Sequence, residues 1–131
     1  MHEPLILAVD QGTSGTKVLL FDSKGEVRAT RYKEHKQYYP QPGWVEHDPL
    51  EIWSNVAELC ADVIKEAAPG AVQAIAITNQ RETVVAWDRH TGKPLAPAVV
   101  WQCRRSVEIC KELQDQGLSQ VFRRKTGLTL D

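Results

Sequence analysis

The fold of this chain is decided by residues 5–22, which read LILAVDQGTSGTKVLLFD. Residues 5–9 form a continuous apolar run, which predicts a strand buried on both faces. The glycine-containing residues 11–15 predict a turn, and residues 16–22 predict a second strand. After another turn, residues 27–37 are polar and alternating, which is typical of an edge strand. We therefore expect an antiparallel meander of three strands.

A helix is predicted next, because its start carries three signals at once. Asp48 stands at the N-cap position, Pro49 at the first helical position and Glu51 three residues after the cap, as in a capping box. The apolar stripe of this helix ends at Pro69. Residues 72–78 then predict a buried strand.

The later elements are shorter. Residues 83–87 and 97–101 predict strands, and residues 106–116 and 119–125 predict helices. The order of elements indicates an α/β fold with a mixed sheet and flanking helices, and differs from the alternating βαβ order of a dinucleotide fold. The apolar residues 128–131 close the chain without a cap, so we expect an unpaired sheet edge there and a fragment of a longer protein.

The composition describes one globular domain. The chain has 131 residues, of which 42% are hydrophobic and 25% are charged, so it can bury a core and is not disordered as a whole. Lys and Arg number 16 against 17 Asp and Glu, with a net charge of −1, which gives no general attraction to nucleic acid or to an anionic membrane. The apolar run at residues 5–9 is too short for a signal peptide or a membrane span.

The cysteines and histidines predict neither a disulfide framework nor a metal centre. The three cysteines are an odd number with loose spacing, which favours reduced thiols in a cytoplasmic protein. The four histidines are scattered, so a metal role for them is not expected. These residues are Cys60, Cys103, Cys110, His2, His35, His47 and His90.

The first candidate site is the turn at residues 10–17. Its glycines allow an anion to approach the backbone closely, and its backbone N–H groups and the hydroxyls of Thr13, Ser14 and Thr16 are suited to phosphate oxygens. Asp10 could hold Mg²⁺ directly or through water. Lys17 could add positive charge, although strand alternation leaves its direction open. An ordinary hairpin turn is the alternative, and neither the Walker A pattern nor the Rossmann glycine spacing is present.

Two further polar segments follow predicted strands. In residues 78–83, Arg81 and Glu82 could grip a polyol as donor and acceptor; the alternative is a solvated loop with an exposed ion pair. In residues 100–105, Trp101 could form the apolar wall of a small pocket; the alternative is a core tryptophan at a strand end. The Arg104–Arg105 pair is interpreted as the surface at a helix start, and residues 38–48 as a rigid structural loop.

These stretches, taken together and in this order, resemble the FGGY carbohydrate kinase family, and within it most closely the N-terminal part of the glycerol kinases. The resemblance covers essentially the whole chain. It implies a ribonuclease-H-like fold of the actin, hexokinase and Hsp70 class, here incomplete. The residues that carry it are 10–13 (DQGT), 39–49 (YPQPGWVEHDP), 78–83 (TNQRET) and 100–105 (VWQCRR).

The resemblance also implies a reaction and a set of roles. Mg·ATP would be the phosphoryl donor and glycerol the acceptor, giving sn-glycerol 3-phosphate. Arg81 and Glu82 would hydrogen-bond the glycerol hydroxyls, Trp101 would wall the apolar side of the pocket, and Asp10 would lie near Mg²⁺ and the reacting centre. The residues expected at the ATP phosphates are Gly12, Thr13, Ser14, Gly15 and Lys17.

The sequence departs from the family in two respects. Residues 12–17 read GTSGTK, which resembles the xylulose-kinase branch, and Lys17 stands where glycerol kinases usually carry an arginine with its bidentate fork. Family members are also several times longer, and neither their catalytic base, a later aspartate, nor their nucleotide-binding domain has a counterpart here. We therefore expect residues 1–131 to be the N-terminal portion of the substrate-side domain, and to be inactive alone because phosphoryl transfer needs both sides of the cleft.

Two other functions remain open on this reasoning. One is a different FGGY sugar kinase, of the xylulose type. The other is a stand-alone, non-catalytic module that binds a polyol or a partner. For the lead hypothesis the expected partners are glycerol or a related polyol, with no nucleic acid and no membrane, and the full-length enzyme is expected to be a homo-oligomer.

Overall fold

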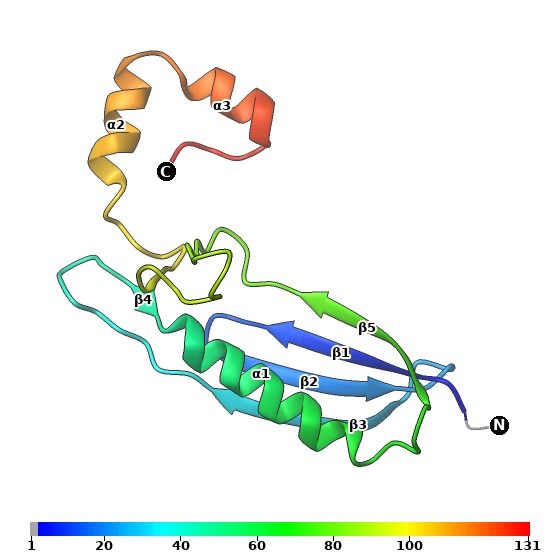
Figure 1. The fold of residues 1–131 in the computed structure, drawn as a ribbon. Coiled ribbons are helices and arrows are strands. Elements are labelled where there is room, and N and C mark those ends of the chain that lie inside the picture. Colours follow the sequence, from blue (N-terminus) through cyan, green and yellow to red (C-terminus); the bar gives the residue numbers. More distant parts are fainter. Residues whose placement is uncertain (1–2) are drawn as a thin grey trace.

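The computed structural model describes residues 3–131, so His2 lies outside the described residues. Its main feature is a four-stranded sheet in the order β3-β2-β1-β5 (Figure 1). The strands β1, β2 and β3 are antiparallel, whereas β5 runs parallel to β1. The predicted meander and mixed sheet are thus confirmed. The strand bounds are β1 (Leu5–Gln11), β2 (Gly15–Phe21), β3 (Val27–Glu34) and β5 (Val72–Thr78).

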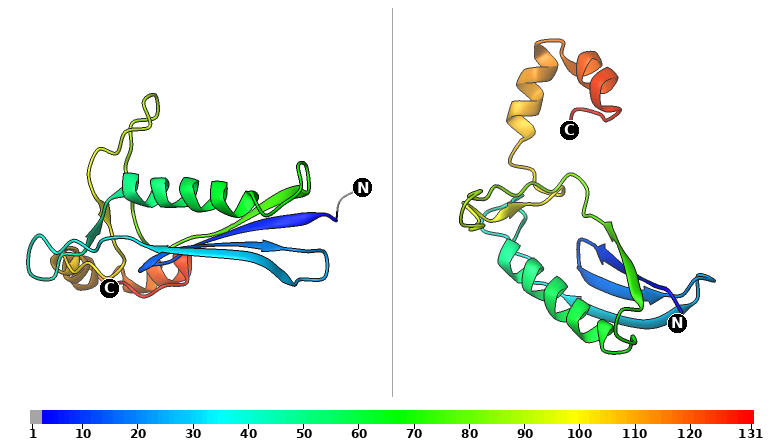
Figure 2. Two further views of the ribbon diagram at one scale, coloured as in Figure 1. Left: turned by 90° about the horizontal axis from the view of Figure 1, so that it is seen from below. Right: turned by 45° about the vertical axis from the view of Figure 1, so that its right-hand side comes forward.

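Helix α1 (Pro49–Ile64) covers one face of this sheet (Figures 1 and 2). Side chains alternate along β1, so Leu7 is 1% exposed and packs in the core, whereas Ile6 on the other face is 43% exposed. The prediction of a strand buried on both faces was therefore wrong for the described residues, because α1 covers only one side. The core residues are Leu5, Leu7, Val9, Val18, Leu20, Ala29, Leu59, Val63 and Ala71.

The start of α1 follows the sequence signals in part. Asp48 is the N-cap, and its Oδ1 accepts the backbone N–H of Leu50 at 2.8 Å. Glu51 does not close a capping box: its Oε1 accepts the backbone N–H of Lys36 at 3.1 Å instead. The carboxylate therefore joins the helix start to the segment that follows β3.

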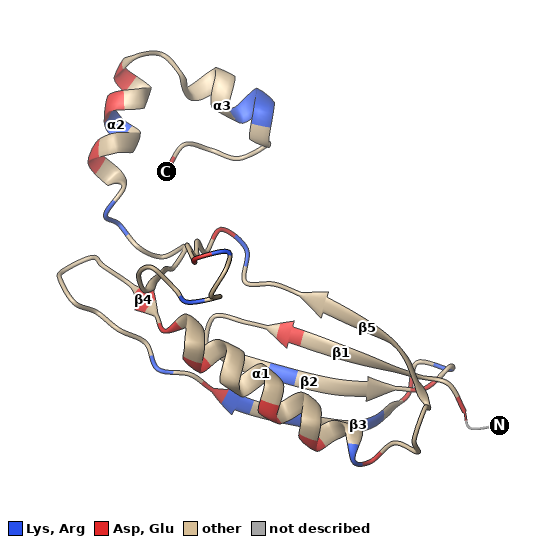
Figure 3. Ribbon diagram, in the orientation of Figure 1, with Lys and Arg blue, Asp and Glu red and all other residues tan. Residues whose placement is uncertain are grey.

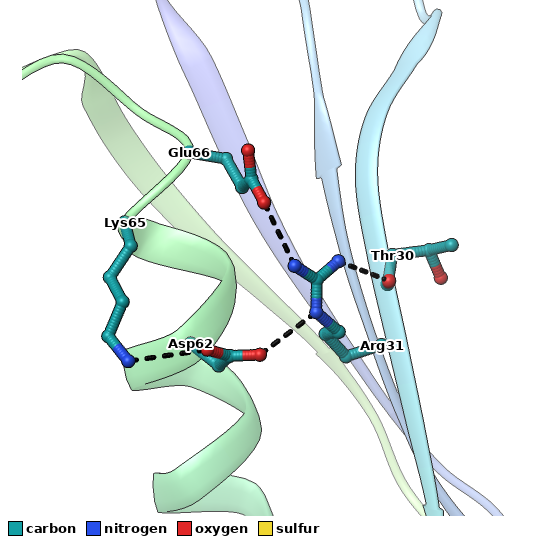
Figure 4. A network of polar contacts seen from close by, with 5 residues as sticks. All are labelled: Thr30, Arg31, Asp62, Lys65 and Glu66. Atoms are coloured by element: carbon teal, nitrogen blue, oxygen red, sulfur yellow. Dashed lines mark hydrogen bonds and ion pairs between the residues drawn. The ribbon is translucent and has the colours of Figure 1, made fainter.

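Ion pairs join the other end of α1 to β3 (Figure 4). The Arg31 guanidinium contacts Asp62 Oδ2 at 2.9 Å and Glu66 Oε1 at 2.9 Å, and Lys65 contacts Asp62 Oδ1 at 3.3 Å. The hydrogen bond from Arg31 holds the pKa of the Asp62 carboxyl below its ordinary value. These pairs lie at the surface, so they orient the helix more than they stabilise it.

Strand β5 differs from its predicted environment. Residues 72–78 form a strand as expected, but Ile75 is 64% and Ile77 is 74% exposed. The prediction of a buried strand was wrong because β5 is one of the two edge strands of the described sheet and projects beyond the cover of α1. An apolar sequence run indicates which residues favour burial, and not whether the described chain supplies a cover.

The segment between β5 and α2 contains little regular structure. Strand β4 (Glu46–His47) pairs with β6 (Ala98–Val99) in a second, two-stranded sheet. The strand predicted at residues 83–87 is present only as isolated bridges of Val84 to Val99 and Trp87 to Pro94. Proline residues in the returning segment lack the N–H that a continuous ladder needs. A small second cluster of buried side chains here consists of Val45, Val100 and Cys103.

Helices α2 (Val107–Asp115) and α3 (Ser119–Thr126) lie away from the main sheet (Figures 1 and 2). Residues 128–131 do not form a strand, so the expected sheet edge at this end of the chain was wrong; the edge strands of the four-stranded sheet are β3, as predicted, and β5. Charged side chains of both signs are distributed over the molecule, with a basic cluster near the end of α3 (Figure 3). No helix within residues 3–131 is sufficiently long and apolar to span a bilayer.

Candidate functional site

The turn between β1 and β2 is held by its own hydrogen bonds. The backbone N–H of Gly12 donates to the carbonyl of Gly15 at 3.0 Å. The hydroxyl of Thr16 donates to Gln11 Oε1 at 2.6 Å, and Gln11 Nε2 donates to the carbonyl of Gly12 at 3.1 Å. The turn is thus a defined loop between two core strands, which is the setting that a rigid anion site requires.

Gly15 is required for close packing at this turn. A Cβ at position 15 would lie 2.6 Å from the carbonyl oxygen of Lys33 and 2.7 Å from the hydroxyl of Tyr32. Only a residue without a side chain allows β3 to approach β2 this closely. Gly15, which was predicted to contact phosphates, is therefore required by the packing of β2 against β3.

A cleft of about 390 Å³ lies at the end of β1. Strands β1 and β5 are parallel neighbours, with Asp10 paired to Thr78, so their carboxyl ends meet at one edge of the sheet. The turn after β1 and the polar segment after β5 consequently face the same space. The cleft is lined by Asp10, Gln11, Gly12, Thr13, Asn79, Gln80, Arg81, Glu82 and Trp101.

Three sequence candidates that lay far apart in the chain therefore meet in one cleft. Asp10, Gly12 and Thr13 come from the first segment, Arg81 and Glu82 from the second, and Trp101 from the third. The cleft combines donors, carboxylates and one aromatic face, which is a suitable set for a polar ligand with an apolar edge.

Glu82 adopts a strained backbone conformation within the cleft. Its φ of 62° places it in the left-handed region, and it is the single non-glycine residue with positive φ among the described residues. This conformation costs about 1 kcal/mol or more for a residue with a side chain. Strain of this kind concentrates at functional sites, where the surrounding structure holds a side chain in a required direction.

Trp101 lines the cleft in direct contact with the turn. Its indole N–H donates to Thr13 Oγ1 at 3.0 Å, and its side chain is half exposed. The prediction of an apolar wall is compatible with this position. The contact with Thr13 was not predicted, because nothing in the local sequence relates the two residues.

Ser14, Gly15 and Lys17 lie beside the cleft and are not among its lining residues. Lys17 is exposed and pairs in register with Asp10 across the β1–β2 ladder. Cross-strand partners project from the same face of a sheet, so Lys17 shares the face of Asp10, opposite α1.

The two arginines after Trp101 have structural contacts. Arg105 contacts Glu46 at 2.6 Å, donates to Cys103 Sγ at 2.9 Å and stacks over Trp44 with its Cζ 3.7 Å from the ring centroid. Arg104 contacts the carboxylate of Asp131 at 2.9 Å. Arg105 thus belongs to the packing around the small second cluster, whereas the Arg104 pair lies at the surface.

A larger groove of about 690 Å³ lies near the β4–β6 pair, lined mainly by tyrosine, proline and leucine side chains. Its two carboxylates are already engaged, Glu46 by Arg105 and Asp48 by the α1 N-terminus. The smaller cleft therefore remains the better candidate for polar chemistry.

Sequence reasoning missed several residues at or behind the cleft. Gln11, Asn79 and Gln80 line the cleft. They lie within the DQGT and TNQRET segments, and this was the feature of the sequence that could have identified them. Gln37 and His47 hold the turn from behind, with Gln37 Nε2 donating to the carbonyl of Thr13 at 2.8 Å. His47 is fully buried, and burial together with the neighbouring His35 lowers its pKa to about 4.

The residues present are compatible with Mg²⁺ held mainly by a ligand's phosphates. Within residues 3–131 there is no cluster of three or more His, Cys, Asp or Glu side chains suited to a metal ion. Mg²⁺ bound with nucleotides commonly takes only one or two carboxylates besides phosphates and water. Asp10, exposed at the cleft, provides such a carboxylate.

Comparison with known proteins gives a consistent result. The profile of the N-terminal domain of the FGGY family of carbohydrate kinases matches residues 5–131. The chain is 50% identical over 128 residues to glycerol kinase 2 of Thermotoga maritima, with 96% of the chain and 26% of that protein covered. The chain thus spans about a quarter of the length of such curated relatives.

Solved structures of sugar kinases have the same fold. The crystal structure of Plasmodium falciparum glycerol kinase with ADP aligns with a TM-score of 0.83 and 36% identity, covering 98% of this chain and 26% of that one. The ligand-bound xylulose kinase of Lactobacillus acidophilus aligns with a TM-score of 0.89 and 25% identity, covering 97% of this chain and 26% of that one.

Proposed function

Because this chain belongs to the FGGY family of carbohydrate kinases, we propose that it is the N-terminal, substrate-side portion of an ATP-dependent glycerol kinase. Its fold is the incomplete ribonuclease-H-like fold of that class, as the likeness to sugar kinase structures indicates. The reaction is the transfer of the γ-phosphoryl group of ATP to glycerol, giving sn-glycerol 3-phosphate.

We assign the turn after β1 to the phosphates of ATP. Its glycines allow close approach, and its backbone N–H groups and the Thr13 hydroxyl are suitable donors to phosphate oxygens. Trp101 donates to Thr13 Oγ1, which leaves the hydrogen of that hydroxyl available for a ligand. When bound, Mg²⁺ would neutralise developing charge on the phosphates, and Asp10 is the residue that would hold it. Ser14 in the turn, and Gly15 and Lys17 at the start of β2, contribute shape and positive charge.

We assign the segment after β5 to the acceptor. Arg81 and Glu82, in the segment after β5, line the same cleft as the turn after β1. The arginine donates hydrogen bonds and the glutamate accepts them. A polyol hydroxyl requires both kinds of partner. Trp101 presents an aromatic face for the carbon side of the acceptor, and the strained backbone of Glu82 supports a functional direction for its carboxylate.

The observation that carries the choice of glycerol is the acceptor segment TNQRET within a chain 50% identical to a glycerol kinase. The runner-up is a kinase for xylulose or a related sugar, favoured by the GTSGTK turn. That turn lies on the phosphate side, which all these kinases share, so it bears less directly on the choice of acceptor.

The remainder of the catalytic apparatus is assigned to residues outside this chain, which covers 26% of its relatives' length. We place there the general base that removes the proton of the attacking hydroxyl, and the nucleotide-binding domain. Residues 1–131 alone are then expected to be inactive. A stand-alone module that binds a polyol without turnover is the alternative.

The test is a kinase assay of the complete protein that contains these residues. With Mg·ATP, we expect glycerol to be converted to glycerol 3-phosphate at roughly 1–100 s⁻¹, a usual range for kinases, and more efficiently than xylulose or gluconate. A preference for xylulose would support the runner-up. Turnover by residues 1–131 alone at this rate would contradict the assignment of the base to the remainder.

A further inference from the structure

A partly buried series of hydrogen bonds connects His47 to the turn after β1. His47 Nε2 lies 2.7 Å from Gln37 Oε1, and Gln37 Nε2 donates to the carbonyl oxygen of Thr13 at 2.8 Å. His47 is 0% exposed and is fixed by the pairing of β4 with β6. The series of hydrogen bonds therefore connects a rigid point of the second sheet to the turn.

The direction of each hydrogen bond follows from the chemistry of the groups. The carbonyl of Thr13 can only accept, so the amide nitrogen of Gln37 must face it. The amide oxygen of Gln37 then faces His47, and an oxygen can only accept, so His47 Nε2 must carry a hydrogen. The low pKa of the buried His47 supports a neutral ring, which is then the Nε2–H tautomer.

The same segment holds the next carbonyl of the turn. The backbone N–H of His35 donates to the carbonyl of Ser14 at 3.3 Å. In a trans peptide the C=O and the following N–H point in opposite directions. Holding the Thr13 carbonyl toward Gln37 thus directs the N–H of Ser14 away from Gln37, and fixes the orientation of a donor that a phosphate oxygen would use.

We infer that His47 is a positioning residue that acts through Gln37 to orient the Thr13–Ser14 peptide for phosphate binding. His47 lines neither the turn nor the cleft around it. The inference rests on the proposed function insofar as the turn binds the phosphates of ATP. The hydrogen-bond chain itself does not depend on that function.

The first test is steady-state kinetics of the complete protein with His47→Phe, which keeps the ring volume and removes the donor. We expect the KM for ATP to rise about tenfold, since a partly buried Gln37 oxygen loses its partner, with the KM for glycerol within about twofold of the wild type. His47→Gln places an amide nitrogen near the position of Nε2 and should recover most of the loss. His35→Phe is the matched control: it removes a neighbouring buried ring, at a centroid distance of 4.5 Å, and retains the backbone donor to Ser14.

The second test asks whether His47 acts through Gln37. Gln37→Met removes both hydrogen bonds of the amide at similar size. If the two residues form one chain, His47→Phe combined with Gln37→Met raises the KM for ATP no further than Gln37→Met alone. Independent, additive losses would overturn the inference. If His47→Phe does not fold, His47→Leu, which also removes the donor, takes its place in the same comparison with Gln37→Met.

The third test is independent of catalysis. Amide hydrogen exchange at residues 12–15 should be faster in His47→Phe and Gln37→Met, and unchanged in His35→Phe. If the wild type makes no glycerol 3-phosphate, the proposed function fails while this exchange result still decides the inference. Unchanged exchange together with an unchanged KM for ATP in His47→Phe would overturn it.

Discussion

The indole N–H of Trp101 donates a hydrogen bond to the hydroxyl of Thr13 at 3.0 Å, although 88 positions separate the two residues in the chain. The contact joins the acceptor side of the proposed site to the phosphate side. The same aromatic ring can face a polyol and orient a hydroxyl of the phosphate turn. The two halves of the cleft are thereby mechanically connected.

Replacement of Trp101 separates these two roles. Trp101→Phe keeps an aromatic face and removes the N–H donor, so we expect the KM for ATP to rise by about 3- to 10-fold, the value of one hydrogen bond, with little change in the KM for glycerol. Trp101→Ala also removes the wall and should raise both constants. Steady-state titration of each substrate in the complete protein measures the difference. An equal effect of Phe and Ala on glycerol would contradict a separate wall role.

Arg81 distinguishes glycerol from xylulose as the acceptor. If Arg81 holds glycerol hydroxyls, Arg81→Ala should reduce kcat/KM for glycerol by roughly 10- to 100-fold, as expected for loss of charged hydrogen bonds, and should remove the preference over xylulose. Arg89→Ala, on an exposed turn, is the control. A loss confined to xylulose would favour the runner-up function.

Gly15 and Gly12 provide a matched comparison of packing at the turn. Gly15→Ala forces a Cβ to 2.6 Å from the Lys33 carbonyl, whereas the nearest atom to a Cβ at Gly12 is the Gly15 carbonyl at 3.3 Å. We expect Gly15→Ala to destabilise the protein by about 1–3 kcal/mol through strand separation, and Gly12→Ala by less. Chemical denaturation of both variants checks the order, and the reverse order would contradict it.

The buried histidine predicts a dependence of stability on pH. The pKa of His47 falls from 6.5 to about 4 in the folded protein, chiefly because of burial, with a further contribution from nearby His35. A side-chain hydrogen bond with Gln80 and the charge of Glu51 oppose this shift. Between these values the unfolded chain binds a proton that the folded chain does not, so stability is complete above pH 6.5 and is lost as the pH falls toward 4. The loss is at most about 3 kcal/mol.

Thermal unfolding between pH 4 and 7 measures this dependence. His47→Phe should flatten the part of the slope that lies between pH 4 and 6.5. A substitution at the exposed His90, such as His90→Ala, should leave the slope intact. A wild-type melting temperature that is constant across this window would contradict the assignment.

The ion pairs of Arg31 predict a small, salt-dependent stabilisation. Arg31→Met removes the contacts with Asp62 and Glu66 that join β3 to α1. We expect a lower melting temperature at low salt and a smaller difference at 1 M salt, because surface pairs are screened. Arg124→Met, an exposed arginine on α3, is the control. A difference that persists at high salt would indicate lost packing of the Arg31 stem instead.

Local sequence patterns were sufficient for most elements. The apolar run and turn of residues 5–22 predicted the β1–β2 hairpin, and the Asp48–Pro49 signal predicted the start of α1 within one residue. Both depend on neighbours in the chain, through side-chain alternation and a cap that is two residues from its donor. The motifs also contained the residues that line the cleft, including Arg81 and Glu82.

Burial could not be predicted from the same patterns. The apolar runs of β1 and β5 indicate a preference for burial on both faces, yet Ile6 and Ile77 are exposed in the described structure. Whether a face is covered depends on how many layers pack on the sheet, and that number is not a local property of a strand.

The amino-acid sequence alone decided where strands, turns and the first helix form, because those choices rest on interactions over a few residues. The tertiary structure decided which polar groups meet. Parallel pairing of β1 with β5 brings Asp10 to the edge where Arg81 and Glu82 follow, and the loop after β3 returns so that Gln37 lies between His47 and Thr13. Such contacts join segments through the packing of α1 and the second sheet, and no spacing along the chain encodes them.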